Sequence, residues 1–130
     1  MILVDSSAWV EYLRATGSDI HARVRVYNDN TTQLAMTEVV AMELLAGVRN
    51  AAEEDQVDRI VTGLPMLHML GLEDFVEAAL LYRLCRRGGE TVRRMTDCLV
   101  AAVAIRNDVP VLHRDADFDV LARHTALQVA

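Results

Sequence analysis

Short, mostly apolar runs alternate along the chain with longer segments in which apolar residues recur every three or four positions. Apolar runs that are too short for a helix are typical of strands buried on both faces of a sheet. We expect such strands at residues 2–4, 33–36, 66–69, 110–112 and 127–129.

The longer segments have the apolar spacing of helices with one buried face. Gly88 and Gly89 are expected to stop the helix that begins at Leu72, and Thr96 is the expected N-cap of the helix that begins at Asp97. The expected helices cover residues 7–13, 20–27, 38–48, 52–61, 72–87, 97–106 and 117–123. Because strands and helices alternate, the sequence predicts an α/β fold with a mainly parallel central sheet flanked by helices.

The composition fits a single domain spanning residues 1–130, since 52% of the residues are hydrophobic and can fill one core. No segment has the length and hydropathy of a membrane span, and the first apolar run lacks the basic start of a secretory signal. We therefore expect a cytoplasmic protein without a membrane segment. Cys85 and Cys98 are then expected to be buried free thiols.

The charge of the chain restricts its chemistry. A formal net charge of -6 argues against a general nucleic-acid-binding surface. All 13 basic residues are arginine, and the absence of lysine excludes P-loop phosphate binding and lysine Schiff bases.

Three acidic residues stand where a ligand site is expected in a parallel sheet, beyond the carboxyl ends of the strands. Asp5 directly follows the first strand, and Asp115 comes shortly after the strand at 110–112. Asp97 opens the helix that precedes this strand. We expect these carboxylates to converge.

Glu43 is a fourth candidate, although it lies in the middle of a helix. Its neighbours three and four residues away are all apolar or small, so its side chain is expected to point towards the protein. Asp97 likewise has Val100 and Ala101 three and four residues after it, whereas Glu77 follows other acidic residues and is expected to lie on the surface.

Carboxylates that are buried together raise one another's pKa, and their desolvation adds a further cost. A bound divalent cation would compensate, and an all-oxygen ligand set suits Mg²⁺ or Mn²⁺ rather than Zn²⁺. The alternative is that Asp97 and Asp115 only cap helices and that Asp5 only ends a strand.

Four segments together resemble PIN domains: V-D-S-S-A-W at residues 4–9, Glu43 in mid-helix, Thr96-Asp97 at a helix start, and R-D-A-D-F at residues 114–118. The acids follow one another at intervals of 38, 54 and 18 residues, and the resemblance covers the whole chain. A free-standing chain of this length resembles the VapC toxins within that family. The resemblance implies a three-layer fold.

The resemblance also implies an activity and its partners. VapC toxins are Mg²⁺-dependent endoribonucleases, silenced by a cognate VapB-like antitoxin, and a structured RNA such as tRNA is the implied substrate. A homodimer is also implied. On the matching positions, Asp5 and Asp97 would bind the metal, with Glu43 and Asp115 completing the catalytic pocket.

The same resemblance gives supporting roles to residues around these acids. Asp117 is a candidate additional acid, and Ser7 matches a hydroxyl residue that supports the first aspartate. Thr96, as the expected N-cap, would place Asp97 at a helix N-terminus, where the helix dipole favours an anion. His113, between the strand at 110–112 and Asp115, could lie at the rim of the pocket.

A net acidic nuclease needs a local basic patch to hold RNA. Five arginines just before Asp97 are candidates, although they could equally cap a helix, solvate a loop or contact the antitoxin. Arg114 stands where a small polar residue is common, and it could bind RNA phosphate or pair with Asp115. The candidate RNA-binding residues are Arg83, Arg86, Arg87, Arg93, Arg94 and Arg114.

Two other functions compete with this one. A haloacid-dehalogenase-type phosphatase would need D-x-D after the first strand and a lysine, but position 7 is Ser and the chain has no lysine. A catalytically degenerate PIN-like domain that only binds a partner remains the alternative.

Overall fold

The structure is a computed structural model that describes residues 1–30 and 33–130. Within these residues, two helices separate the first two strands, and four helices separate the second strand from the third. Their order is β1 (Ile2–Val4), α1 (Ser6–Leu13), α2 (Asp19–Asp29), β2 (Leu34–Ala35), α3 (Glu38–Ala46), α4 (Ala51–Gly63), α5 (Leu72–Arg87), α6 (Met95–Arg106), β3 (Val111–Leu112) and α7 (Ala116–His124).

The three strands form one parallel sheet in the order β2–β1–β3. In the register, Ile2 is opposite Leu34 and Leu3 is opposite Val111. Leu3 and Val4 of the central strand are fully buried, as expected for a continuous apolar run in a sheet covered on both faces.

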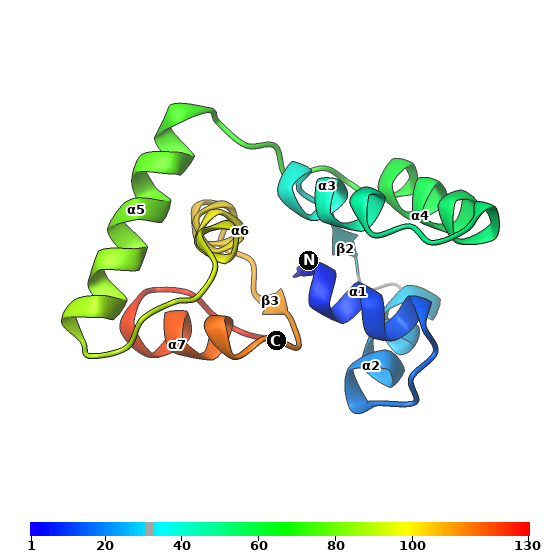
Figure 1. Ribbon diagram of the computed structural model, residues 1–130, viewed down its shortest axis with the longest axis horizontal. Coiled ribbons are helices and arrows are strands. Elements are labelled where there is room, and N and C mark those ends of the chain that lie inside the picture. The colour runs from blue at the N-terminus through cyan, green and yellow to red at the C-terminus, as the bar shows by residue number, and fades with distance from the viewer. Residues whose placement is uncertain (31–32) are drawn as a thin grey trace.

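The sheet separates two groups of helices. In Figure 1, α5, α6 and α7 lie on the left of the sheet, α1, α2 and α4 lie on the right, and α3 lies above it. Helix α6 packs against α5 and α7, and it also contacts α3 across the molecule. The predicted α/β fold, a parallel sheet flanked by helices in three layers, is confirmed.

Two predicted strands are reduced to isolated bridges. Among the described residues, Met66 pairs only with Met36, and Val129 pairs only with Val111. The strand expected at 66–69 does not form because the backbone N–H of Met69 donates to the Glu38 carboxylate (2.9 Å) instead of to a neighbouring strand. Of the strand expected at 127–129, only Val129 forms a bridge in the part of the chain that the structure describes, and its partner is Val111. The side chain of Val129 is 40% exposed.

The predicted start of α6 is also wrong. The helix begins at Met95 and its N-cap is Arg94, so Thr96 lies inside the first turn and does not cap it. The acceptor for the N–H groups before this turn is the side chain of Asp117, which comes from α7.

The hydrophobic core lies between the helices and the sheet, with Trp9 and Phe118 as its largest fully buried side chains. Cys85 and Cys98 are buried and free, as expected. Within the described part of the chain, every helix falls short of the length and apolar content that a membrane span requires.

Candidate active site

Asp5 joins the central strand to the first helix. Its backbone N–H donates to the carbonyl of Leu112 (2.9 Å), which extends the pairing of β1 and β3 by one residue. Its carboxylate then caps α1, because Oδ2 accepts the backbone N–H (2.9 Å) and the hydroxyl (2.6 Å) of Ser7. The side chain is only 2% exposed. The strand end and the helix start together fix this buried carboxylate.

Asp115 occupies the equivalent position after β3. It is the N-cap of α7, and its Oδ1 accepts the backbone N–H of Asp117 (2.9 Å). The loops after β1 and β3 meet because these parallel strands are neighbours, and the backbone N–H of Arg114 donates to Oγ of Ser7 (2.9 Å). The sheet therefore brings Asp5 and Asp115 to the same edge.

Asp97 reaches this edge from the first turn of α6 and is 2% exposed. One carboxylate oxygen each from Asp97, Asp115 and Asp117 lie within 4.8 Å of one another, which is close enough for a shared ion. The predicted convergence of Asp97 and Asp115 is therefore found. Asp117, which the sequence offered only as a candidate additional acid, lies in the same cluster.

Glu43 approaches from α3 and is half-buried. Burial raises its pKa, and the nearby charge of Asp5 raises it further, whereas the hydroxyl of Ser6 and the guanidinium of Arg94 lower it. These effects place Glu43 beside the other acids.

The pKa values of Asp97 and Asp5 are both raised. Burial raises the pKa of Asp97 to about 9, and the hydrogen bond with Asp117 and the charges of Asp5 and Asp115 act in the same direction. Burial also raises the pKa of Asp5, against the opposing hydrogen bonds from Ser7. These raised pKa values favour the protonated form of both carboxyls when no cation is bound.

In contrast to Asp5, Glu43 and Asp97, Asp117 has a lowered pKa. Burial acts to raise its pKa, but hydrogen bonds from the backbone of Arg93 and Arg94 and from the Asp97 side chain outweigh it and lower the pKa. Asp117 is therefore ionised and accepts the hydrogen bond from protonated Asp97.

Three carboxylate oxygens in this group are buried and have no hydrogen-bond partner among the described residues: Asp5 Oδ1, Glu43 Oε1 and Asp97 Oδ2. A buried polar atom without a partner is costly, so three such atoms together need compensation. A divalent cation with a preference for oxygen ligands fits this donor set.

The predicted basic residues separate into two groups. Arg93 is at the cluster, with its guanidinium 3.3 Å from Oδ1 of Asp115 and 3.5 Å from Oδ1 of Asp117, and its side chain is 73% exposed. The guanidinium of Arg94 is close enough to Glu43 to lower the pKa of the Glu43 carboxyl. Arg83, Arg86 and Arg87 lie exposed towards the end of α5, where Arg86 covers the ring of Tyr82.

Arg114 pairs with Glu11 of α1 (2.8 Å). Arg114 was expected either to bind RNA phosphate or to pair with Asp115. Among the described residues, the structure gives it no ion pair with Asp115. Its side chain is half exposed and stays at the edge that carries Asp5.

His113 contributes to the site indirectly. Its Nδ1 accepts the backbone N–H of Asp115 (3.1 Å), and its ring packs against Phe118. Only 11% of the His113 side chain is exposed. Its hydrogen bond with Asp115 supports the start of α7.

Two contacts of the site were not predicted from the sequence. These are the pairing of Arg93 with the acids and the hydrogen bonds of Asp117 to the start of α6. The D-x-D spacing at Asp115 and Asp117 was visible, but both contacts join residues more than twenty positions apart.

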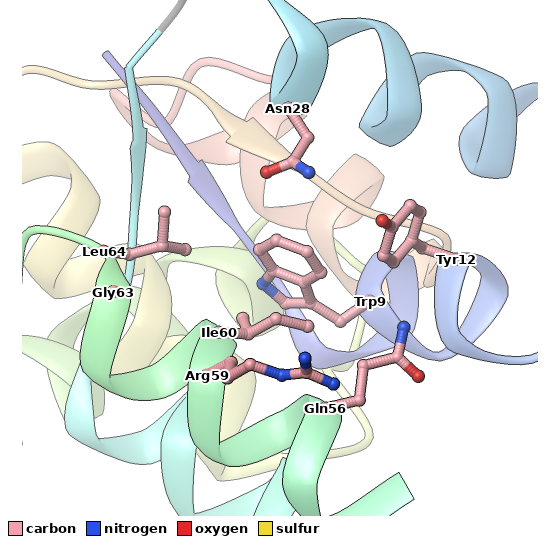
Figure 2. Close-up of a pocket in the computed structure, with 8 residues that line it drawn as sticks. All are labelled: Trp9, Tyr12, Asn28, Gln56, Arg59, Ile60, Gly63 and Leu64. Atoms are coloured by element: carbon pink, nitrogen blue, oxygen red, sulfur yellow. The ribbon is translucent and has the colours of Figure 1, made fainter. Parts of the chain in front are cut away.

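A separate cavity of about 270 Å³ opens between α1, α2 and α4 (Figure 2). Trp9, Ile60 and Leu64 form its apolar part, and Asn28 and Arg59 add polar groups. None of the acids described above lines it, so the cavity is distinct from the acidic cluster.

Comparisons with known proteins agree with this arrangement. Residues 2–124 match the family model of the PIN domain. The chain is 50% identical over 131 aligned residues to VapC ribonuclease Mb1587 of Mycobacterium bovis and to Ribonuclease VapC11 of Mycobacterium tuberculosis. Each match covers 100% of this chain and 98% of the relative.

Solved structures share the fold at much lower identity. VapBC2 from Rickettsia felis, bound to a DNA fragment from the promoter, has a TM-score of 0.73 at 16% identity, covering 100% of this chain and 98% of that chain. Mycobacterium tuberculosis VapC20, described as a sarcin–ricin loop cleaving toxin, has a TM-score of 0.67 at 19% identity, covering 97% of each chain.

Proposed function

The chain belongs to the PIN-domain family and to the VapC ribonucleases within it, and from this we propose that it is the endoribonuclease toxin of a toxin–antitoxin pair. The observation that carries the proposal is the group of buried carboxylates with three oxygens that lack a hydrogen-bond partner among the described residues. The substrate is RNA, cleaved at its phosphodiester bonds.

We propose Mg²⁺ as the cofactor, with Mn²⁺ as a substitute, because all candidate ligands are carboxylate oxygens. Asp5 and Asp97 would hold the ion, and both have a buried oxygen without a partner. Glu43 and Asp115 would complete the acidic pocket. When bound, the ion would supply the positive charge that lowers the pKa of the attacking water and offsets charge on the phosphate.

The residues around the ion prepare the reaction. Ser7 holds Oδ2 of Asp5, and Oδ1 has no hydrogen-bond partner in the described part of the chain. Asp97 would lose its proton to solvent before its carboxylate could hold the ion. Glu43, whose pKa is raised by burial, is suited to accept the proton of the attacking water at Oε1.

Exposed arginines would hold the RNA backbone beside this pocket. Arg93 and Arg94 adjoin the acids, and Arg114 lies at the same edge. Arg86 and Arg87 could extend the contact along α5. The site suits a single-stranded or loop segment of a structured RNA such as tRNA, since the bases of an A-form duplex are poorly accessible in its deep groove.

A VapB-like antitoxin is the proposed protein partner. Solved proteins with this fold include VapBC toxin–antitoxin complexes, which supports such a partner. We also propose a homodimer and action in the cytoplasm, where the RNA substrate is available; both rest on the family resemblance.

The test is cleavage of purified tRNA and total RNA by the isolated protein, with Mg²⁺ or with EDTA, beside Asp97→Asn. The matched control is Glu73→Gln, an exposed acid on α5. The proposal predicts discrete fragments that EDTA and Asp97→Asn both abolish and that the control keeps. Folded protein whose melting temperature rises with Mg²⁺ but which cleaves no RNA would favour the alternative of a catalytically degenerate binding module.

A further inference from the structure

Asp117 lies where α7, the start of α6 and the loop after β3 meet. Its Oδ1 accepts the backbone N–H of Arg93 (3.1 Å), and its Oδ2 accepts the backbone N–H of Arg94 (3.0 Å). The side chain is 2% exposed. Both oxygens of this carboxylate are therefore used by backbone donors inside the protein.

These two bonds hold the two residues that lead into α6, the N-cap Arg94 and Arg93 before it. The N-cap of α6 is Arg94, whose side chain makes no capping hydrogen bond. Asp117 therefore fixes the start of α6 from 23 residues further along the chain.

The same residue is also tied to Asp115, because the backbone N–H of Asp117 donates to Oδ1 of Asp115 (2.9 Å). Asp97 lies in the first turn of α6, three residues after Arg94. The position of Asp97 relative to Asp115 therefore depends on contacts made by one side chain and its own backbone.

We infer that Asp117 is a positioning residue of the proposed metal centre and not one of its ligands: it fastens α6 to α7 so that the carboxylates of Asp97 and Asp115 face each other. This inference rests on the proposed function. Asp117 is close enough to Asp97 and Asp115 to share an ion, but its oxygens already accept backbone N–H groups. Within residues 1–30 and 33–130, the buried carboxylate oxygens that lack a hydrogen-bond partner belong to Asp5, Glu43 and Asp97.

The test compares Asp117→Asn, Asp117→Ala and Asp97→Asn in the full chain. Mn²⁺ binding is measured by electron paramagnetic resonance, and exchange of the Arg93 and Arg94 amides is measured by NMR. Asparagine keeps one acceptor oxygen and alanine keeps none. Exchange should therefore quicken from wild type to Asp117→Asn to Asp117→Ala, and Mn²⁺ affinity should fall in the same order, by about 10–100-fold, as for residues that orient metal ligands.

Asp97→Asn should do the reverse, losing Mn²⁺ binding while the two amides stay protected. The inference is overturned if Asp117→Asn loses Mn²⁺ binding with both amides still protected, because Asp117 is then a ligand. It is also overturned if the amides exchange faster while Mn²⁺ affinity stays at the wild-type value. Should Asp117→Ala not fold, the Asp117→Asn comparison decides. Failure of the wild-type chain to bind Mn²⁺ would instead overturn the proposed metal centre, and this needs no variant.

Discussion

The hydroxyl of Ser7 donates a hydrogen bond of 2.6 Å to Oδ2 of Asp5, the acid that ends the central strand. The same hydroxyl accepts the backbone N–H of Arg114 (2.9 Å). One small side chain thus orients the carboxylate and joins the two loops that follow β1 and β3. Oδ1 of Asp5 is left without a partner among the described residues, in the position where a cation can use it.

Replacing Ser7 with alanine should weaken cation binding, because Asp5 loses the side-chain donor that orients it. We expect about a 10–100-fold loss of Mg²⁺ affinity, and a loss of about 1 kcal/mol of folding free energy. Mg²⁺ affinity is measured from the rise of the melting temperature as Mg²⁺ is added.

Ser18→Ala is the matched control, since Ser18 caps α2 by accepting the N–H of His21 (3.1 Å). It should cost similar stability, about 1 kcal/mol, without changing Mg²⁺ affinity. Equal Mg²⁺ affinities for Ser7→Ala and the wild type would show that the hydroxyl does not serve the metal centre.

Stability without metal should depend on pH through Asp97. Its pKa is about 9 in the folded protein and about 4 in an unfolded chain. The folded state therefore binds this proton more tightly, and the resulting stability is lost as pH rises towards 9. The raised pKa values of Asp5 and Glu43 act in the same direction.

In EDTA, the melting temperature should therefore fall from mildly acidic to mildly alkaline pH, and the rise caused by Mg²⁺ should grow, because the ion binds the deprotonated carboxylates. Asp97→Asn should make the fall of the melting temperature smaller, because the variant lacks the carboxyl whose pKa is raised to about 9. A variant that loses as much stability as the wild type over this range would rule out Asp97 as the cause.

Much of the fold follows from local patterns, and so does part of the site. Apolar runs placed β1 and β3, and since these strands are parallel neighbours, the acids after them had to share one edge of the sheet. The apolar neighbours of Glu43 also indicated correctly that it faces the protein, where its Oε1 is buried.

The errors came from contacts between distant parts of the chain. Thr96 has the chemistry of an N-cap, but Asp117 supplies the acceptor for the start of α6 from a different helix. Of the two roles considered for Arg114, pairing with Asp115 is not found among the described residues, because its side chain pairs with Glu11 on α1. A local pattern cannot report which of several acids a long side chain will reach once the fold is complete.

The arginines at the site should contribute to RNA affinity. Arg94→Gln should weaken binding of a single-stranded RNA and reduce the slope of log affinity against log salt concentration by about one. Fluorescence anisotropy in EDTA measures binding without cleavage. Arg25→Gln, an exposed arginine on α2, is the control and should change neither quantity. If both variants bind like the wild type, RNA uses another surface.

The turn after α5 should not tolerate a larger residue at Gly88, because a Cβ there would overlap the ring of His124. That ring is held by Glu90 (2.9 Å), which also pairs with Arg123. Gly88→Ala should therefore cost about 1–3 kcal/mol of folding free energy, measured by urea denaturation. Gly63→Ala, where a Cβ meets open space, should cost nothing; equal stabilities for the two variants would contradict the crowding at Gly88.

The most direct test of the metal-dependent nuclease is the cleavage rate of one defined RNA as Mg²⁺ is titrated, for the wild type and for Asp97→Asn. The rate should rise and saturate, with a midpoint equal to the Mg²⁺ dissociation constant obtained from the rise of the melting temperature with Mg²⁺. It should be lower in the variant by more than about 100-fold at every concentration. A rate that is independent of Mg²⁺, or the same in wild type and variant, would contradict a catalytic metal held by this carboxylate cluster.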